Sequence, residues 1–415
     1  MMKKLVIGEP VIVSQSTTEA IRAGGWQDPE IRCSNGVLYV RFSGVRDEYE
    51  NHDRENRNPV FKSVDCGVTW ARVENPAKEW TEAQTPISNG DKVRFTGSPL
   101  ITDKELLAKL GEPAVERGAD KMKVPAYKGV YTNAEMRKIL GDDCNKTIMS
   151  HRLKKGETEL VNQLCEVRWD DLAYGLVFNG YVGAMYAQPY REDKDGVLYL
   201  PVATHCVNPD GSLVSGYRSM SMLKSTDHGY SWEHVGTCEY HDEYNIPNAI
   251  EVEGFMECAF EICDDGSFFM IMRSGSISPY VIGDDDHPSP KCMITYSYDK
   301  GKTWTKPEVF YEYGVLPRSV KKGDGTILMT SGRPDVYVRA CYDGKGKEWD
   351  DVIHVLDVPK EYYYNGYWEY TCSNNDVCAY DDKTAFLTYS NFQLTTPEGV
   401  RAKSIIVRKI SIVEE

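Results

Sequence analysis

A chain of 415 residues with a formal net charge of −15 is too long for one small core, and it is too acidic to bind nucleic acid or an anionic membrane surface by general attraction. Its 27 tyrosines and 8 tryptophans favour β-structure, so we expect an all-β protein. An anionic ligand would need a local group of arginines in this acidic background.

The first residues do not predict a targeting segment. Residues 1–9 carry two lysines but an apolar run of only four residues, which is too short for a signal peptide. No run of the sequence approaches the ~18 apolar residues that cross a membrane. The twelve cysteines lie mostly in apolar runs without zinc or redox spacing, which indicates buried thiols in a reducing compartment. We expect a cytoplasmic protein, unless a leader has been removed, with no metal and no cofactor.

The chain repeats one eight-residue phrase, Ser-x-Asp-x-Gly-x-(Thr/Ser)-Trp. Three copies lie at residues 63–70, 225–232 and 297–304, and a looser fourth copy has Asp343, Gly346 and Trp349. Strand-like runs flank the copies, and Asp, Ser and Gly are residues that form tight turns. Each copy therefore predicts a hairpin turn onto which its Trp packs, and these residues are expected to be structural.

Read with its flanks, the phrase resembles the Asp-box, or BNR repeat, of the sialidase (neuraminidase) superfamily. The resemblance implies a six-bladed β-propeller, here a single domain over residues 1–415. A blade needs roughly 40 to 50 residues, which the interval from Asp299 to Asp343 matches. Propellers commonly close their ring by pairing the chain ends, so residues 5–13 are expected to join the last blade.

The interval between the first two copies is too long for the blades it must contain. Two capping boxes, Thr102 to Glu105 and Thr132 to Glu135, each precede a helical run. We therefore expect a helical or irregular insertion at residues 99–160, in the region of blade 2. It is either a surface decoration or a lid over the site.

The resemblance also implies site residues at one end of the propeller axis, away from the repeated turns. Sialidases begin with Tyr/Phe-Arg-Ile-Pro, whose Arg is one of three that bind the substrate carboxylate. This chain has Gln27 in place of that Arg. Arg22 and Arg32 lie nearby in the sequence, but neither matches the motif.

The next polar loop matches the family's Arg, acidic loop and repeat in that order. Arg46 takes the place of the Arg, and Asp53 takes the place of the acid/base catalyst, with Asp47 as the fallback. The loop is rich in charge throughout, so a merely solvated loop is the alternative. His205 is a further candidate because we expect it in a loop on the same face.

The closest match to the family is the segment of residues 256–273. Its first Glu and last Arg, Glu257 and Arg273, correspond to functional residues of sialidases, with an Asp-Gly turn between them in register. Two antiparallel strands joined by such a turn bring the first residue of one beside the last residue of the next. We therefore expect a buried carboxylate beside a ligand-binding Arg, or else a surface ion pair across a hairpin.

Arg333 precedes the fourth copy of the repeat, as does another carboxylate-binding Arg of the family, and its guanidinium suits a planar carboxylate. The nucleophilic Tyr of the family has no direct counterpart, because its place falls near Asn374. Tyr370 lies four residues earlier. A Tyr nucleophile needs a neighbouring carboxylate to take its proton, and Glu257 would have that role.

The first hypothesis is a glycoside hydrolase that removes a terminal acidic sugar, such as sialic acid, from a glycan. The carboxylate would be bound by Arg273 and Arg333, the leaving oxygen protonated by Asp53, and the base would be Glu257. The second is a propeller hydrolase or lyase acting on a uronic acid or a neutral sugar. The third is a carbohydrate-binding propeller without catalysis. In all three the partner is a carbohydrate, and the sequence does not indicate an oligomeric state.

Overall fold

The computed structural model describes the chain in the segments that follow, and all structural statements refer to them. These segments are residues 3–17, 26–44, 58–80, 83, 85–101, 104–110, 115–116, 129–170, 172–177, 181–183, 185–206, 217–244, 254–274, 291–362 and 369–414. Arg22, Arg46, Asp47 and Asp53 lie outside the described residues. Within the described part, no helix is both long enough and apolar enough to cross a membrane.

The described strands form five sheets, three of which are simple four-stranded meanders. The first contains β3 (Gln27–Ser34), β4 (Val37–Ser43), β5 (Val60–Ser63) and β6 (Ala71–Arg72). The second contains β21 (Cys258–Ile262), β22 (Phe268–Ser274), β23 (Lys291–Ser297) and β24 (Glu308–Tyr311). The third contains β25 (Val315–Lys321), β26 (Ile327–Gly332), β27 (Val336–Cys341) and β28 (Ile353–Leu356).

A larger sheet lies between the first and second meanders in the sequence. One part contains β7 (Thr85–Pro86), β8 (Lys92–Gly97), β12 (Ile148–Leu153) and β13 (Leu160–Arg168). The other contains β16 (Met185–Ala187), β17 (Arg191–Glu192), β18 (Leu198–Cys206), β19 (Ser219–Ser225) and β20 (Ser231–Cys238). A short parallel pairing of β13 with β20 joins the two parts.

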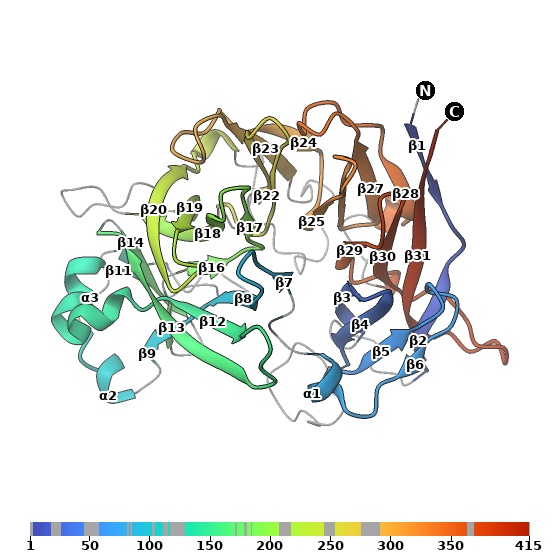
Figure 1. Cartoon of the computed structure of the whole chain (residues 1–415), viewed down its shortest axis with the longest axis horizontal. Coiled ribbons are helices and arrows are strands. Elements are labelled where there is room, and N and C mark those ends of the chain that lie inside the picture. Colours follow the sequence, from blue (N-terminus) through green and yellow to red (C-terminus); the bar gives the residue numbers. More distant parts are fainter. Residues whose placement is uncertain are drawn as a thin grey trace.

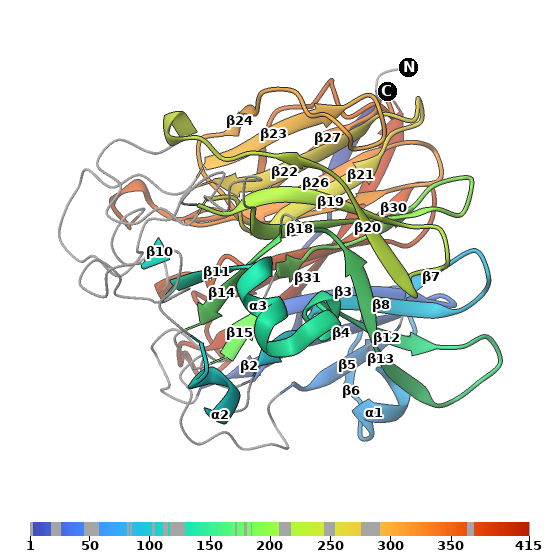
Figure 2. The ribbon, with the colours of Figure 1, turned by 90° about the vertical axis from the view of Figure 1, so that its left-hand side faces the viewer.

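The helix α1 (Pro76–Glu79) lies beside the first sheet, where Lys62 of β5 bonds to Glu79 (Figure 1). The remaining elements between residues 99 and 183 extend the large sheet or cover its outside. They are β9 (Pro99–Ile101), α2 (Lys104–Leu107), β10 (Val115–Glu116), β11 (Gly129–Thr132), α3 (Asn133–Leu140), the 3₁₀ helix η2 (Gly141–Asn145), β14 (Leu172–Val177) and β15 (Tyr181–Gly183). Two more 3₁₀ turns are η3 (Asp242–Tyr244) and η4 (Lys360–Tyr362). Figures 1 and 2 show α2 and α3 on one outer flank, away from the centre.

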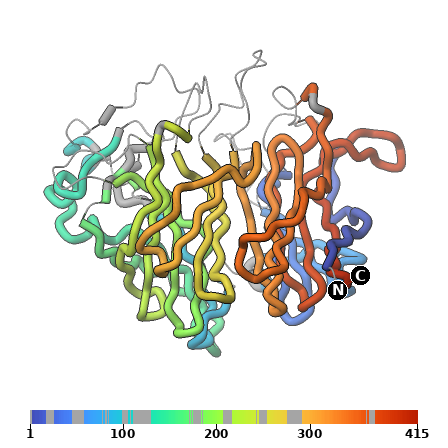
Figure 3. The backbone as a smooth tube through the Cα atoms, turned by 90° about the horizontal axis from the view of Figure 1, so that it is seen from above, coloured from blue at the N-terminus to red at the C-terminus, as the bar shows by residue number. Residues whose placement is uncertain are grey.

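The last sheet contains both ends of the chain. It consists of β29 (Asn375–Ala379), β30 (Thr384–Asn391) and β31 (Lys403–Glu414), with β1 (Lys3–Ile7) and β2 (Val11–Ser16) both paired to β31. Leu5 pairs with Ile412, for example. The predicted pairing of the chain ends is therefore confirmed, and Figure 3 shows the two termini side by side.

The sheets follow one another around a common centre in chain order (Figure 1). Alternate residues of β4 are buried, as expected for strands that pack by one face on a neighbour. Apolar side chains fill the space between successive sheets. Phe269 and Ile271 of β22, for example, share a core with Met329 of β26 and Tyr337 of β27. The predicted mostly-β fold is confirmed, with neighbouring sheets packed face to face.

The repeated phrase forms the same turn in each of its three full copies. The backbone N–H of its Gly donates to the Oγ of the Ser four residues earlier, at 2.8 to 2.9 Å. Its Asp accepts from the backbone N–H four residues later, at 2.9 Å in every copy. The φ of the Gly lies between 83° and 87°, a region that favours glycine. The predicted turns are thus confirmed.

The predicted insertion is helical only in part. The capping box of Thr132 and Glu135 is present and begins α3, as expected. Residues 148–153, however, form strand β12, which pairs with both β8 and β13. The prediction of a helical or irregular segment is wrong there. Its buried positions include Ser150 and Arg152, so the strand has no simple alternation of apolar and polar residues.

Candidate functional site

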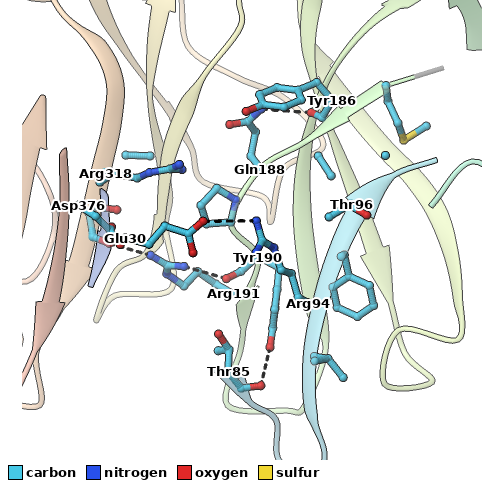
Figure 4. Close-up of a pocket in the computed structure, with 18 of the residues that line it drawn as sticks. Glu30, Thr85, Arg94, Thr96, Tyr186, Gln188, Tyr190, Arg191, Arg318 and Asp376 are labelled. Carbon is cyan, nitrogen blue, oxygen red and sulfur yellow. Dashed lines mark hydrogen bonds and ion pairs between the residues drawn. The ribbon is translucent and has the colours of Figure 1, made fainter. Parts of the chain in front are cut away.

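A cavity of about 530 Å³ lies at the common centre of the sheets. Its walls come from strands far apart in the sequence, and they are polar or charged at several positions. Among the lining residues are Glu30 of β3, Arg94 of β8, Tyr186 of β16, Arg191 of β17, Arg318 of β25 and Asp376 of β29. Figure 4 shows Arg318 and Asp376 on one side of this pocket, with Tyr186 and Gln188 facing them.

Glu257 lies next to this cavity, two residues before the lining residue Ala259. It directly precedes β21, and Arg273 lies near the end of the partner strand β22. The Nη1 atom of Arg273 is 3.3 Å from Oε1 of Glu257, and the Arg273 side chain is only 10% exposed. The backbone N–H of Arg273 also donates to the carbonyl of Glu257 at 3.0 Å. The predicted contact across the hairpin is confirmed.

A bulge at the start of β25 supplies a second partner for this carboxylate. The pairing of β25 with β26 shifts register between Val315 and Arg318, and Leu316 has a φ of 48°. The backbone N–H of Leu316 donates to Oε2 of Glu257 at 2.8 Å. Bulges bend a strand and redirect its side chains, and here the distortion turns a backbone donor toward the site.

Three arginines act on the charge of Glu257. Burial alone would raise its pKa, but the positive charges of Arg273, Arg333 and Arg318, together with the Leu316 N–H, lower it below its ordinary value. Arg273 and Arg333, which the sequence predicted separately, thus act on one carboxylate. Arg318 was not predicted. We call Arg273, Arg318 and Arg333 the arginine cluster.

The loop that carries Arg333 is held by a buried carboxylate. Arg333 has a φ of 67°, and its backbone N–H donates to the carbonyl of Asp335 at 2.9 Å. Asp335 is fully buried, and its Oδ2 accepts from the Tyr313 hydroxyl at 2.9 Å and contacts Nδ1 of His354 at 2.5 Å. Asp357 completes a group of possible metal ligands, but the direct contact between Asp335 and His354 already accounts for their closeness.

Glu30 in the cavity wall and the neighbouring Glu261 already have cationic partners. Glu30 lies 2.8 Å from Arg41, 2.9 Å from Arg32 and 3.8 Å from Arg94. Burial would raise its pKa, but these arginines lower it to about 2. Glu261 is buried and accepts from Arg191 at 2.6 and 2.7 Å.

Asp376, which also lines the cavity, differs from Glu30 and Glu261. Its oxygens accept from the backbone N–H groups of Ile31 and Val377, both at 3.0 Å. Burial raises its pKa to about 6, although the charge of Arg318 opposes that rise. Asp376 therefore gains a proton in a mildly acidic solution, whereas Glu257 stays ionised.

The remaining predicted residues lie elsewhere or differ from expectation. Gln27 begins β3 at the rim of the first sheet, half-buried and paired with Ser43. His205 belongs to β18 and is only 2% exposed, so its prediction as a loop residue open to substrate is wrong. The strand continues three residues beyond the apolar run, which ends at Ala203. Asn374 donates to Asp28.

Tyr370 does not join the cluster. Its ring lies 5.0 Å from that of Tyr362, and burial together with a hydrogen bond to Tyr362 raises its pKa. No hydrogen bond links Tyr370 to Glu257 within the described segments. A different tyrosine, Tyr186, lines the cavity and is 46% exposed; partial burial raises its pKa, and the negative charge of Glu257 raises it further. No motif predicts Tyr186, because β16 is a three-residue strand without a repeat nearby.

No protein-family model and no curated protein matches the chain. Among solved structures, a protein of unknown function from Dyadobacter fermentans aligns over 99% of both chains, with a TM-score of 0.58 and 15% identity. This likeness shows that the whole chain shares its fold with that protein.

Two glycosidases also align at lower scores. The α-L-arabinanase of Penicillium chrysogenum, solved with arabinobiose, matches 97% of this chain and 98% of its own, with a TM-score of 0.47 and 13% identity. The Trypanosoma rangeli sialidase, solved with the inhibitor DANA, matches 93% of this chain with a TM-score of 0.41 and 13% identity. The chain spans 55% of the length of that sialidase.

Proposed function

We propose that the protein is a six-bladed propeller glycoside hydrolase of the sialidase-like type, which removes a terminal sugar that carries a carboxylate. The observation that carries this proposal is the arginine cluster gathered around the ionised Glu257 beside a central cavity. Guanidinium groups bind carboxylates through paired, charge-assisted hydrogen bonds. In an acidic protein, such a concentration of positive charge favours an anionic ligand over a neutral one.

In this proposal the sugar carboxylate binds to Arg273 and Arg333. Glu257 accepts a proton during the reaction, which its lowered pKa allows because the group is ionised before substrate binds. The acid that protonates the leaving oxygen is Asp53, and Arg46, seven residues earlier in the sequence, is a further substrate contact. Gln27 contributes at most a neutral hydrogen bond from β3.

The stereochemical course follows from the partner of Glu257. Because Tyr370 packs on Tyr362, we propose that Glu257 activates a water molecule directly rather than a tyrosine nucleophile. Direct attack by water inverts the configuration at the anomeric carbon. Proton NMR of the first-formed product distinguishes the two courses, since a retained anomer requires a covalent intermediate.

The decisive test is the release of sugar from sialyl-lactose and from the 4-methylumbelliferyl glycosides of sialic and glucuronic acids. Wild-type protein is expected to release at least one acidic sugar, and Arg273→Ala is expected to lose that activity. Arg168→Gln is the control, because Arg168 is an exposed residue outside the cavity lining. Failure of the wild type on every acidic glycoside would reject the proposed activity.

A second candidate is carbohydrate binding without cleavage. It is favoured by the replacement at the family's nucleophile position, where Asn374 bonds to Asp28 instead of presenting a phenol. Under this alternative, acidic or neutral sugars bind in the cavity but remain intact after long incubation. Mass spectrometry of the incubated glycan separates this outcome from hydrolysis, and it also identifies a released uronic acid or neutral sugar.

A further inference from the structure

The proposed carboxylate site lacks one charge on the side of the first sheet. Gln27 stands where the resemblance places an Arg, and a neutral amide binds a carboxylate more weakly than a guanidinium does. Arg32, the nearest described arginine in the sequence, does not supply the charge, because it lies 2.9 Å from Glu30. A third cation must therefore come from another strand, if the site has one.

Arg318 differs from the other arginines that line the cavity. These are Arg32, Arg94 and Arg191, and each lies within 4 Å of a carboxylate of Glu30 or Glu261. For Arg318, the described part of the chain offers neither an ion pair nor a hydrogen bond to the guanidinium. Figure 4 shows this side chain extending from β25 into the pocket. Its charge is therefore available to a ligand.

The bulge in β25 explains why this arginine points inward. The strand carries an extra residue between Val315 and Arg318 relative to β26, so the side chains beyond the bulge are redirected. The same bulge presents the Leu316 N–H to Glu257 at 2.8 Å. One local distortion thus positions a partner of the catalytic carboxylate and directs Arg318 toward the cavity.

The positive charge of Arg318 acts on two carboxylates, Glu257 and Asp376. Its charge lowers the pKa of Glu257 and opposes the rise in the pKa of Asp376. Glu257 already has Arg273 and the Leu316 N–H, and Asp376 has two backbone donors. Neither carboxylate makes a direct contact with the guanidinium in the described structure.

We propose that Arg318 binds the carboxylate of the substrate and supplies, from β25, the positive charge that Gln27 does not provide. The ligand class is a monosaccharide with a carboxylate, either a sialic acid or a uronic acid. This assignment rests on the proposed function, because it concerns the same site. It adds a specificity residue that the sequence motifs do not contain.

The test compares Arg318→Gln with Arg168→Gln, which removes an exposed arginine outside the pocket. Binding of N-acetylneuraminic acid, glucuronic acid and neutral galactose is measured by calorimetry, with thermal melting as the check on folding. Replacing a charge-assisted hydrogen bond by a neutral one is expected to weaken the binding of acidic sugars about tenfold, or about 1.4 kcal/mol. Galactose affinity and the Arg168→Gln control should not change.

Each outcome bears on the assignment. If wild-type protein binds acidic sugars and Arg318→Gln binds them equally well, the role of Arg318 is overturned while the proposed function stands. If the wild type binds neither acidic sugar, both fall together. If the melting temperature of Arg318→Gln is too low for the binding assay, Arg318→Lys is measured instead. This variant keeps the positive charge but loses the planar guanidinium group. A several-fold loss for acidic sugars alone supports the assignment, and unchanged affinity contradicts it.

Discussion

Glu257 and Arg273 face each other at the open end of the β21–β22 hairpin, with 3.3 Å between Oε1 of Glu257 and Nη1 of Arg273. The pair is shielded from solvent, and the Leu316 N–H fixes the second carboxylate oxygen. A carboxylate held in this way keeps its charge and its orientation before any ligand arrives. An incoming sugar carboxylate would share Arg273 with Glu257, so the two groups are coupled electrostatically.

Glu257→Gln is expected to separate catalysis from binding. Removal of the base should lower kcat by about 10² to 10⁴. Removal of its negative charge should leave binding of acidic sugars equal or tighter, because less repulsion opposes the sugar carboxylate. Turnover and calorimetric affinity on one protein sample check both statements. Near-normal turnover in this variant would remove Glu257 from the mechanism.

Binding of acidic sugars is expected to strengthen as the pH falls through about 6, the value to which burial raises the pKa of Asp376. Below it Asp376 is neutral, so Arg318 on β25 loses a competing negative charge. The other charged groups that act on Asp376 are Glu30 and Arg32 of β3. Glu30, with a pKa of about 2, stays ionised in this range.

The matching variant is Asp376→Asn, which is neutral at every pH. Its affinity for glucuronic acid should be nearly constant between pH 5 and pH 7, while that of the wild type falls as the pH rises. Sugar carboxylates are fully ionised over this range, so the ligand itself does not titrate. Parallel pH profiles for the two proteins would show that Asp376 does not govern binding.

Glu261→Gln is expected to destabilise the fold. Glu261 is buried, bonded to Arg191 of β17, and accepts from the Ser319 hydroxyl of β25 at 2.8 Å. Breaking a buried pair leaves an uncompensated charge, at a cost of about 3 to 5 kcal/mol. Urea denaturation measures the loss. The double variant Arg191→Met, Glu261→Leu should recover part of it, and equal losses in both variants would argue against this explanation.

Glu30 is expected to make stability depend on acid. Its pKa is lowered from 4.5 to about 2 in the folded state, so its contribution is present above the unfolded pKa and is lost as the pH falls from about 4.5 toward 2. The shift corresponds to on the order of 3 kcal/mol. Glu30→Gln should therefore be less stable than wild type at pH 7, with the gap closing on acidification. A difference in unfolding free energy between the two proteins that does not change with pH would contradict this role of Glu30.

The sequence predicted the features that depend on neighbouring residues. The turns at Asp65, Asp227 and Asp299 are local, and the contact of Glu257 with Arg273 needs only one hairpin. Arg318 and Asp376 were missed because they share one cavity only when strands from separate sheets converge there. A periodicity or motif within a single strand does not predict which other strands it will meet at the cavity.

Two errors have a different physical origin. Strand β12 was missed because its inward positions include Arg152, which is buried and bonded to Asp91 at 2.8 Å, so the apolar pattern is interrupted. The apolar run before His205 ends early and so predicts a loop there, whereas all nine residues of β18 are buried. A hydropathy pattern does not identify polar residues that are buried and hydrogen-bonded inside a fold.

The seam between the first and last sheets brings together distant parts of the chain. Glu30 and Asp376 belong to these two sheets, and the Ile31 N–H bonds directly to Asp376, 345 residues away. Contacts between such distant residues carry a large loop-closure cost and form slowly compared with a local hairpin. We therefore expect that opening of this one seam would disrupt the binding site while most of the sheets remain folded.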